Sequence, residues 1–260
     1  MGELELATVA AANDAWGGTA PLDAEVVETA EYRMVRMPER FGRHVMVQWV
    51  RSARQADAVL ADLAARAAEF GRPDAWVTVR LSAPAGLDEA LLARGAELGD
   101  TYDVLAMPLP AELKAPDLPE LRWATTVDIV RDVNTVATAM FGGTKASEDI
   151  LAQRTVEEQE KFAAGAGSAL AAYVDGMPVG VGSLELVDGV ARLAGSGVLE
   201  SHRGRGIYRA MVAARLTYAE KRGATMALSQ GNITTSSPIL RRLGFVAYGQ
   251  ERSYRLPLTA

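Results

Sequence analysis

The sequence predicts an α/β protein built from two similar domains, residues 1–115 and 116–260. Segments of strand length alternate along the chain with longer segments whose apolar residues recur at helical spacing. The chain has 260 residues, enough for two modest domains, and its hydrophobic content of 49% is ample for their cores. A third observation is a repeat that links the end of the first half to the end of the second.

The repeat consists of identical residues separated by a constant 149 positions (244 − 95). Leu91, Gly95, Pro108 and Leu109 match Leu240, Gly244, Pro257 and Leu258 without gaps. In both places the pattern is typical of the end of a short helix, a turn and a closing strand. Four identities can also arise by chance in a chain rich in Ala and Leu, but the shared order of elements favours two copies of one domain.

The first half is expected to be a degenerate copy. Its predicted strand, helix and second strand are Val45–Val50, Ala53–Phe70 and Ala75–Leu81. The connection Arg51–Gln55 contains no glycine, so a Cβ at every position hinders the close approach of a phosphate group. Pro110–Pro119, with three prolines, is the predicted linker to the second half.

The second half is predicted to contain a longer series of elements. The predicted strands are Leu121–Ala124, Ala169–Val174, Val179–Leu186, Val190–Val198 and Thr225–Ser229, followed by closing strands up to Leu258. The predicted helices are Val127–Met140, Ser147–Ala164, Gly206–Arg222 and Pro238–Leu243.

A basic, glycine-rich segment, His202–Gly206, connects a predicted strand to a predicted helix. Gly204 and Gly206 let the backbone turn tightly and direct successive N–H groups into one small volume. The helix adds its unpaired first-turn N–H groups and the positive end of its dipole, and Arg203 and Arg205 add charge. These features predict a phosphate or pyrophosphate site, although a solvated loop between two core elements could have the same sequence.

The segment that follows the turn carries a further motif, Leu243-Gly244-Phe245, at the end of the last short helix. Together with Arg203-x-x-Gly206-x-Tyr208, it resembles the core of the GNAT superfamily of acyl-CoA N-acyltransferases over residues 198–245. The family usually has a small residue where Tyr208 stands. The resemblance implies tandem GNAT-like domains, each with a mixed central sheet flanked by helices, of which the first lacks the cofactor loop.

The resemblance also implies that acetyl-CoA is the co-substrate, with its pyrophosphate in the turn and its pantetheine arm along the preceding strand. The residues expected to bind it are Ser196, Gly197, Val198, Arg203, Gly204, Arg205, Gly206, Ile207, Tyr208, Asn232 and Ser237. For Gly195–Val198 the alternative is a β-bulge or a tight packing contact. For Ser237 the alternative is capping of the helix that begins at Pro238.

Two residues with which this family often catalyses acyl transfer are missing. The position of a frequent general-acid Tyr holds Leu240, and a Glu often used as a base would fall near Arg192. The catalytic residues are therefore not assigned. The candidates are Glu185, Glu200, Tyr208 and Tyr248. The two carboxylates can equally be solvated surface groups and the two tyrosines packing residues, and positioning of the substrates alone can supply much of the rate.

Composition excludes several kinds of site and partner. Without Cys the chain has no disulfide, thiolate metal site or Cys acyl-enzyme, and with His44 and His202 as its only histidines no metal site is expected. A formal net charge of −6 gives no general attraction to nucleic acid or to an anionic membrane. No apolar run approaches bilayer-spanning length and no secretory signal is visible, which predicts a cytoplasmic protein.

The sequence therefore predicts an acetyltransferase that moves the acetyl group of acetyl-CoA directly to a primary amine, without a covalent acyl-enzyme. On family grounds the acceptor is a small molecule, and a homodimer is one possible assembly. A catalytically silent acyl-CoA-binding or sensing module is the alternative, because the usual Tyr and Glu are missing. An unrelated interaction domain, whose basic turn meets an acidic partner, is a third reading.

Overall fold

The computed structural model describes residues 4–17, 20–21, 23–41, 43–114, 116 and 119–258. The helices are α1 (Leu6–Asp14), α2 (Ala56–Ala68), α3 (Leu87–Ala93), α4 (Val127–Phe141), α5 (Glu148–Ala163), α6 (Ile207–Glu220) and α7 (Ser236–Arg242), with a 3₁₀ turn, η1, at Glu200–His202. The strands are β1 (Glu25–Glu28), β2 (Tyr32–Arg36), β3 (Val45–Val50), β4 (Asp74–Val79), β5 (Glu97–Pro108), β6 (Glu120–Trp123), β7 (Ala169–Val174), β8 (Met177–Val187), β9 (Val190–Val198), β10 (Met226–Asn232) and β11 (Val246–Pro257).

The chain divides into two compact units that are not contiguous in sequence. Unit 1 consists mainly of Leu105–Gln230 with Ile239–Val246, and unit 2 mainly of Glu5–Val104 with Gly231–Pro238 and the chain from Ala247 onward. This division differs from the predicted boundary between residues 115 and 116, because most of β11 belongs to unit 2. In unit 2, β11 pairs with β4 in antiparallel register. The local sequence of a strand does not identify such a distant partner, so the boundary could not be predicted from it.

Each unit contains a mixed sheet, as the sequence predicted. The strand order is β5-β10-β9-β8-β7-β6 in unit 1 and β1-β2-β3-β4-β11-β5 in unit 2. β5 is shared because its residues up to Val104 belong to unit 2 and the rest to unit 1. In unit 1, β9 is parallel to β10 and antiparallel to β8; in unit 2, β3 is parallel to β4 and antiparallel to β2. The two sheets therefore repeat one arrangement of strands.

The offset predicted from the repeat is present in the elements themselves. α3 and α7 begin and end 149 residues apart (236 − 87 and 242 − 93), and so do β5 and β11 (246 − 97 and 257 − 108). The turn after each helix is closed by an equivalent hydrogen bond: the N–H of Ala96 donates to the carbonyl oxygen of Leu91, and that of Phe245 to Leu240, at 3.0 and 3.1 Å. The helix, turn and strand are thus the same in both halves.

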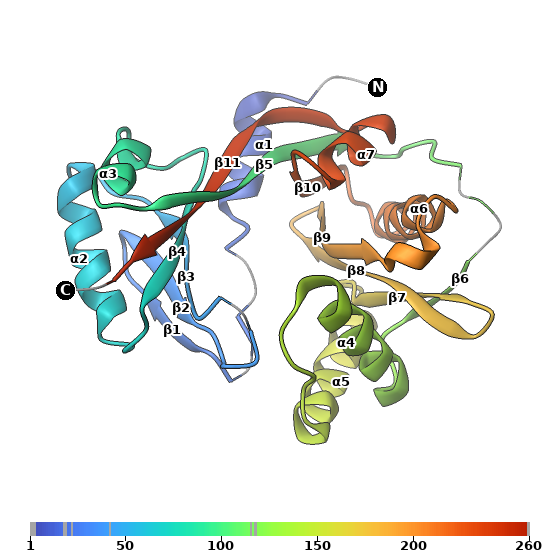
Figure 1. Ribbon diagram of the computed structural model, residues 1–260. Coiled ribbons are helices and arrows are strands. Elements are labelled where there is room, and N and C mark those ends of the chain that lie inside the picture. Colours follow the sequence, from blue (N-terminus) through green and yellow to red (C-terminus); the bar gives the residue numbers. More distant parts are fainter. Residues whose placement is uncertain are drawn as a thin grey trace. The chain divides into compact units, whose positions relative to one another are not determined.

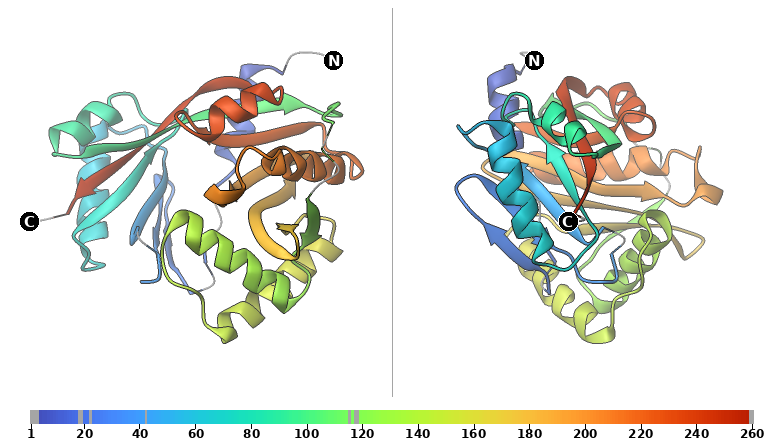
Figure 2. Two further views of the ribbon diagram at one scale, coloured as in Figure 1. Left: turned by 45° about the vertical axis from the view of Figure 1, so that its right-hand side comes forward. Right: turned by 60° about the vertical axis from the view of Figure 1, so that its left-hand side comes forward.

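Two layers of helices cover opposite faces of the unit 1 sheet (Figures 1 and 2). Ala171 and Tyr173 of β7 pack in one apolar cluster with α4 and α5, whereas Leu170 and Ala172 pack in another with α6. Since alternate residues of a strand face opposite sides, the sheet lies between α4 and α5 on one side and α6 on the other. This packing places α6 against β8 and β9, with its N-terminal end next to the end of β9.

In unit 2 the long helix α2 lies along the sheet (Figure 2). Val59, Leu60 and Leu63 of α2 share an apolar cluster with Val47 of β3 and Val77 of β4. This helix confirms the one predicted at Ala53–Phe70, shortened at both ends, whereas α1, β1 and β2 were not predicted. In the part of the chain that the structure describes, no helix is long and apolar enough to cross a membrane.

Candidate active site

The glycine-rich turn lies at the N-terminal end of α6. Gly204 and Gly206 both have a φ of +78°, in the left-handed region that favours glycine. Gly206 is the N-cap of α6, and no side chain of the described residues caps this end. The first hydrogen bond of the helix runs from the N–H of Ala210 to the carbonyl oxygen of Gly206 at 3.0 Å. The N–H groups at 207–209 therefore point out of the helix end without a helical acceptor.

The electrostatics of the turn favour an anion. Arg203 Nε donates to the carbonyl oxygen of Val198 at 3.2 Å, which ties the turn to the end of β9, and Arg205 is exposed. The first turn of α6 contains no acidic residue. The guanidinium groups and the positive end of the helix dipole thus add to one another, and this is the arrangement that binds phosphate groups in proteins.

β9 separates from β10 before it reaches the turn. The register between the two strands runs from Met226 opposite Val190 to Ser229 opposite Leu193, where Ser229 Oγ donates to the Leu193 carbonyl oxygen at 2.9 Å. For Ala194–Val198, the rest of β9, no pairing with β10 is recorded among the described residues. Backbone groups on that side of this segment, which we call the open edge, are available to a ligand that can pair with a strand.

On its other side β9 pairs with β8 through a bulge. Val181 lies opposite Gly197 and Ser183 opposite Ala194, so three steps along β9 match two along β8. Gly195 within the bulge has a φ of +54°. The segment is thus both an open edge and a bulge. The presence of the bulge therefore does not exclude the other interpretation of the sequence, in which this segment binds the pantetheine arm.

A hollow with a volume of ≈ 590 Å³ adjoins the turn and the end of β9. Its lining residues are Ala139, Met140, Leu199, Glu200, Ser201 and Arg203. Met140 also packs against the strand, because a Cβ added to Gly197 would lie 2.6 Å from Met140 Cε. Glu200 is exposed and is the carboxylate in the wall of this hollow.

Most of the residues predicted to bind the cofactor lie together in unit 1. Ser196, Gly197, Val198, Arg203, Gly204, Arg205, Gly206, Ile207 and Tyr208 extend from the open edge to the first turn of α6. The side chains of Val198 and Ile207 are buried in the core, so these two residues can offer a ligand only their backbone groups.

The other two predicted cofactor residues, Asn232 and Ser237, belong to unit 2. Asn232 Nδ2 donates to Asp100 Oδ1 at 3.1 Å. Ser237 is 1% exposed, and its hydroxyl donates to Asp103 Oδ2 at 2.5 Å. Both side chains are therefore engaged within unit 2. In particular, the buried Ser237 hydroxyl has a structural partner where sequence reasoning expected a pantetheine amide.

The candidate acid–base residues do not form one cluster. Glu185 Oε2 lies 3.6 Å from NH1 of the buried Arg192 and compensates its charge. Tyr248 lies on β11, in unit 2. Glu200 is the candidate that lines the hollow. No group of three or more acidic or His side chains among the described residues could hold a metal ion.

Tyr208, the remaining candidate, points into unit 1. Its ring packs against the apolar cluster that contains Val198 and Met211. Burial raises the pKa of its phenol, while the charge of Arg215 and a hydrogen bond with Ser196 lower that pKa. The hydroxyl therefore faces the bulge of β9 and not the outer surface of the turn.

We expect Tyr208→Phe to have a small effect on catalysis. The change removes one buried hydroxyl and should cost about 1 kcal/mol of unfolding free energy, with a loss in kcat below about 100-fold. Chemical unfolding and steady-state kinetics would measure both. Tyr218→Phe is a matched control, because Tyr218 is a buried tyrosine of the same helix whose hydroxyl donates to the Phe162 carbonyl oxygen. A larger kcat loss with unchanged CoA binding would identify Tyr208 as a general acid.

Sequence reasoning missed one polar residue of this region, Arg215. It is completely buried under the bulge, and NH1 donates to the carbonyl oxygen of Ser183 at 3.0 Å and to Ser196 Oγ at 2.7 Å. A single arginine in an Ala-rich helix is normally a solvated residue, so the sequence gives no signal for this burial.

The turn and the open edge have the geometry of a site for an anionic ligand, and comparison with known proteins gives the family. The model of the acetyltransferase (GNAT) family matches residues 132–245. These residues form a GNAT acetyltransferase domain, and acyl transfer is the reaction class of that family. No curated protein matches the chain.

Solved structures confirm the fold over nearly the whole chain. A GCN5-related N-acetyltransferase from Kribbella flavida has a TM-score of 0.66 at 18% identity, covering 97% of this chain and 95% of its own. A tandem GNAT protein from the clavulanic acid biosynthesis pathway, solved without AcCoA, has a TM-score of 0.64 at 16% identity, with 98% and 94% covered. A GCN5-related N-acetyltransferase from Sphaerobacter thermophilus has 0.62 at 18% identity, with 96% and 85% covered. The predicted tandem GNAT-like architecture is therefore confirmed.

Proposed function

We propose that unit 1 binds acetyl-CoA and transfers its acetyl group directly to the primary amine of a small molecule. The observation that carries the proposal is the uncapped, glycine-lined start of α6 beside the open edge of β9. A pyrophosphate can accept hydrogen bonds from the turn, and the amides of a pantetheine arm can pair with Ala194–Val198 as an added strand would. The hollow beside them has a volume in the range that small-molecule sites occupy.

Direct transfer of the acetyl group requires few catalytic side chains. The neutral amine attacks the thioester carbon, a C–N bond forms, the C–S bond breaks, and the amine proton leaves while the thiolate takes up a proton. Backbone N–H groups of the open edge can stabilise the charge on the thioester oxygen. The carboxylate of Glu200 can attract the ammonium form of the acceptor and receive its proton through water. Leu240, which is buried, and Arg192, which is paired with Glu185, take no part as acid or base.

Turnover with a library of primary amines tests the proposal. We expect release of the CoA thiol and an N-acetylated product for a subset of small amines. Binding of acetyl-CoA without turnover of any amine would instead favour the silent acyl-CoA-binding module. A failure to bind CoA at all would overturn the proposed function.

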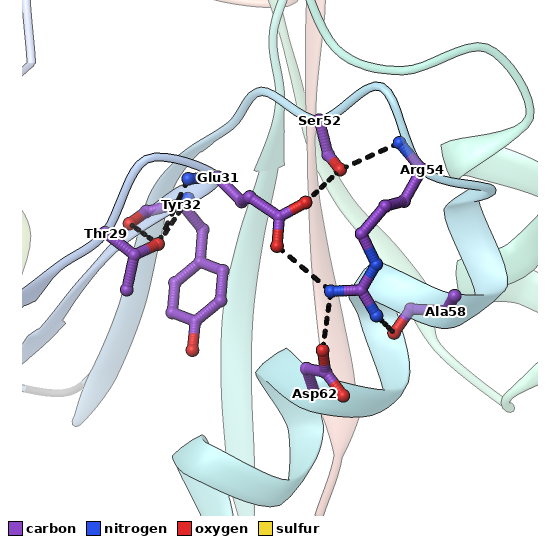
Figure 3. Close-up of polar contacts among 7 residues, drawn as sticks. All are labelled: Thr29, Glu31, Tyr32, Ser52, Arg54, Ala58 and Asp62. Carbon is purple, nitrogen blue, oxygen red and sulfur yellow. Dashed lines mark hydrogen bonds and ion pairs between the residues drawn. The ribbon is translucent and has the colours of Figure 1, made fainter.

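The corresponding turn of the first half is already occupied by the protein's own carboxylates (Figure 3). Glu31 accepts hydrogen bonds from Ser52 Oγ and, at 3.0 Å, from Arg54 NH1, which also pairs with Asp62 at 2.6 Å. The N-cap of α2 is Gln55, with a φ of −57°, where α6 has a left-handed glycine. The arginine and hydroxyl that could hold a phosphate are thus satisfied internally.

We therefore predict one CoA per chain. Calorimetric titration of the full chain should fit a single site, because the equivalent connection in unit 2 has no glycine turn and its Ser52 and Arg54 side chains are bonded to Glu31 and Asp62. Arg54→Ala should leave the affinity for CoA unchanged, whereas Arg203→Ala should weaken it by about tenfold through loss of a charge-assisted contact. Two equivalent sites would contradict this assignment.

A further inference from the structure

Arg215 is a buried cation for which the described part of the chain provides no carboxylate partner. The residue is 0% exposed, and Nε donates to the Met211 carbonyl oxygen at 3.0 Å while NH1 contacts Ser183 and Ser196. NH2 has no hydrogen-bond partner in the described part of the chain, and no ion pair involving Arg215 is recorded there. Ser196 Oγ in turn donates to the Ala194 carbonyl oxygen at 3.2 Å, so the guanidinium holds both ends of the bulge.

The fold provides space for this charge at a cost. A Cβ on Gly182 would lie 2.8 Å from Arg215 NH1, so the glycine on β8 is what admits the guanidinium. Burial lowers the pKa of Arg215 to about 10, and the group therefore remains charged at neutral pH. An apolar side chain at this position would avoid the desolvation penalty of a buried charge. Stabilisation of the fold therefore does not explain why an arginine stands at this position.

We propose that Arg215 is a positioning residue for acyl transfer, which fixes the bulge of β9 and places a positive charge beneath the open edge where the thioester of acyl-CoA lies. This inference rests on the proposed function. During the reaction negative charge develops first on the thioester oxygen and then on the departing sulfur. Because no carboxylate of the described residues pairs with Arg215, its field favours both species over the neutral ground state.

The neighbouring ionisable groups leave this field in place. Tyr208 on α6 is neutral at pH 7, because burial raises the pKa of its phenol. On β8 and β9, Glu185 and Arg192 pair with each other. The net charge under the bulge is therefore that of Arg215.

The pKa of the thiol of bound CoA measures the effect of this charge, and the measurement needs no acceptor substrate. We expect the thiol pKa of CoA in the wild-type complex, followed by ultraviolet absorption of the thiolate, to lie about one unit below that of free CoA. Arg215→Gln retains an amide donor but no charge and should lose this shift, whereas Arg215→Lys should retain it. Arg222→Gln is the matched control and should behave as wild type, because Arg222 is exposed and lies just beyond the far end of α6.

The kinetic counterpart is a fall in kcat of about 10- to 100-fold for Arg215→Gln, with a smaller change in KM for acetyl-CoA and partial recovery in Arg215→Lys. If Arg215→Gln does not fold, Arg215→Met is the second variant; it removes the charge with an unbranched apolar side chain and should likewise lose the shift. An unshifted thiol pKa in a wild-type complex that binds CoA would overturn this inference and leave the proposed function intact. Absence of CoA binding by the wild type would overturn both.

Discussion

Gly206→Val is expected to abolish the binding of acetyl-CoA. Valine strongly disfavours the φ of +78° that this residue adopts, so the turn must rearrange and its N–H groups no longer converge on the pyrophosphate. A Cβ here would also lie 3.1 Å from Pro116 Cγ. We expect a loss of affinity of more than about 100-fold and a stability cost of about 1–3 kcal/mol, measured by calorimetry and thermal unfolding.

Gly223→Val is the control that distinguishes a loss of cofactor binding from the effect of backbone strain alone. Gly223 follows the other end of α6 with a φ of +80°, and a Cβ there meets nothing within 4 Å. The control should therefore lose similar stability while keeping the wild-type affinity for acetyl-CoA. Wild-type affinity in a folded Gly206→Val protein would contradict the assignment of the turn.

Gly167→Ala is expected to unfold unit 1. Gly167 has a φ of +95°, and an added Cβ would lie 2.3 Å from the carbonyl oxygen of Leu184 and 2.9 Å from its carbonyl carbon. Hydrogen bonds from the N–H of Leu184 to Ser168 and from that of Leu186 to Ala166, at 3.0 and 2.8 Å, hold this backbone in place. Because the clash is with backbone and not with a flexible side chain, we expect a loss above about 4 kcal/mol.

The matched control for that change is Gly176→Ala. Gly176 has a φ of +76° but no atom within 4 Å of its ideal Cβ, so it tests the left-handed conformation alone. We expect this control to cost about 1–2 kcal/mol in urea unfolding followed by circular dichroism. Equal stability of the two variants would show that the close approach of Gly167 to β8 is wrong.

Elements whose sequence carries a strong local pattern could be predicted well. β3 and β9 have the predicted bounds, Val45–Val50 and Val190–Val198, because segments rich in apolar residues there end at basic or glycine-rich turns. The tight conformation of the glycine-rich turn could also be predicted, since positive φ at Gly204 and Gly206 is a local property of glycine.

Features that depend on distant partners could not be predicted. β11 pairs with β4 and so contributes to unit 2, although nothing in its own residues selects that neighbour. The burial of Arg215 depends on the missing side chain of Gly182 on another strand. Likewise, the Ser237 hydroxyl bonds to Asp103, which is far from it in sequence.

Hydrogen–deuterium exchange with and without acetyl-CoA tests the central claim most directly, because it locates the cofactor on the backbone itself. We expect acetyl-CoA to slow exchange at the open edge and at the start of α6, residues 194–209, and to leave Arg51–Ala58 in unit 2 unchanged. Protection at Arg51–Ala58, or no protection at residues 194–209 under saturating acetyl-CoA, would contradict that claim.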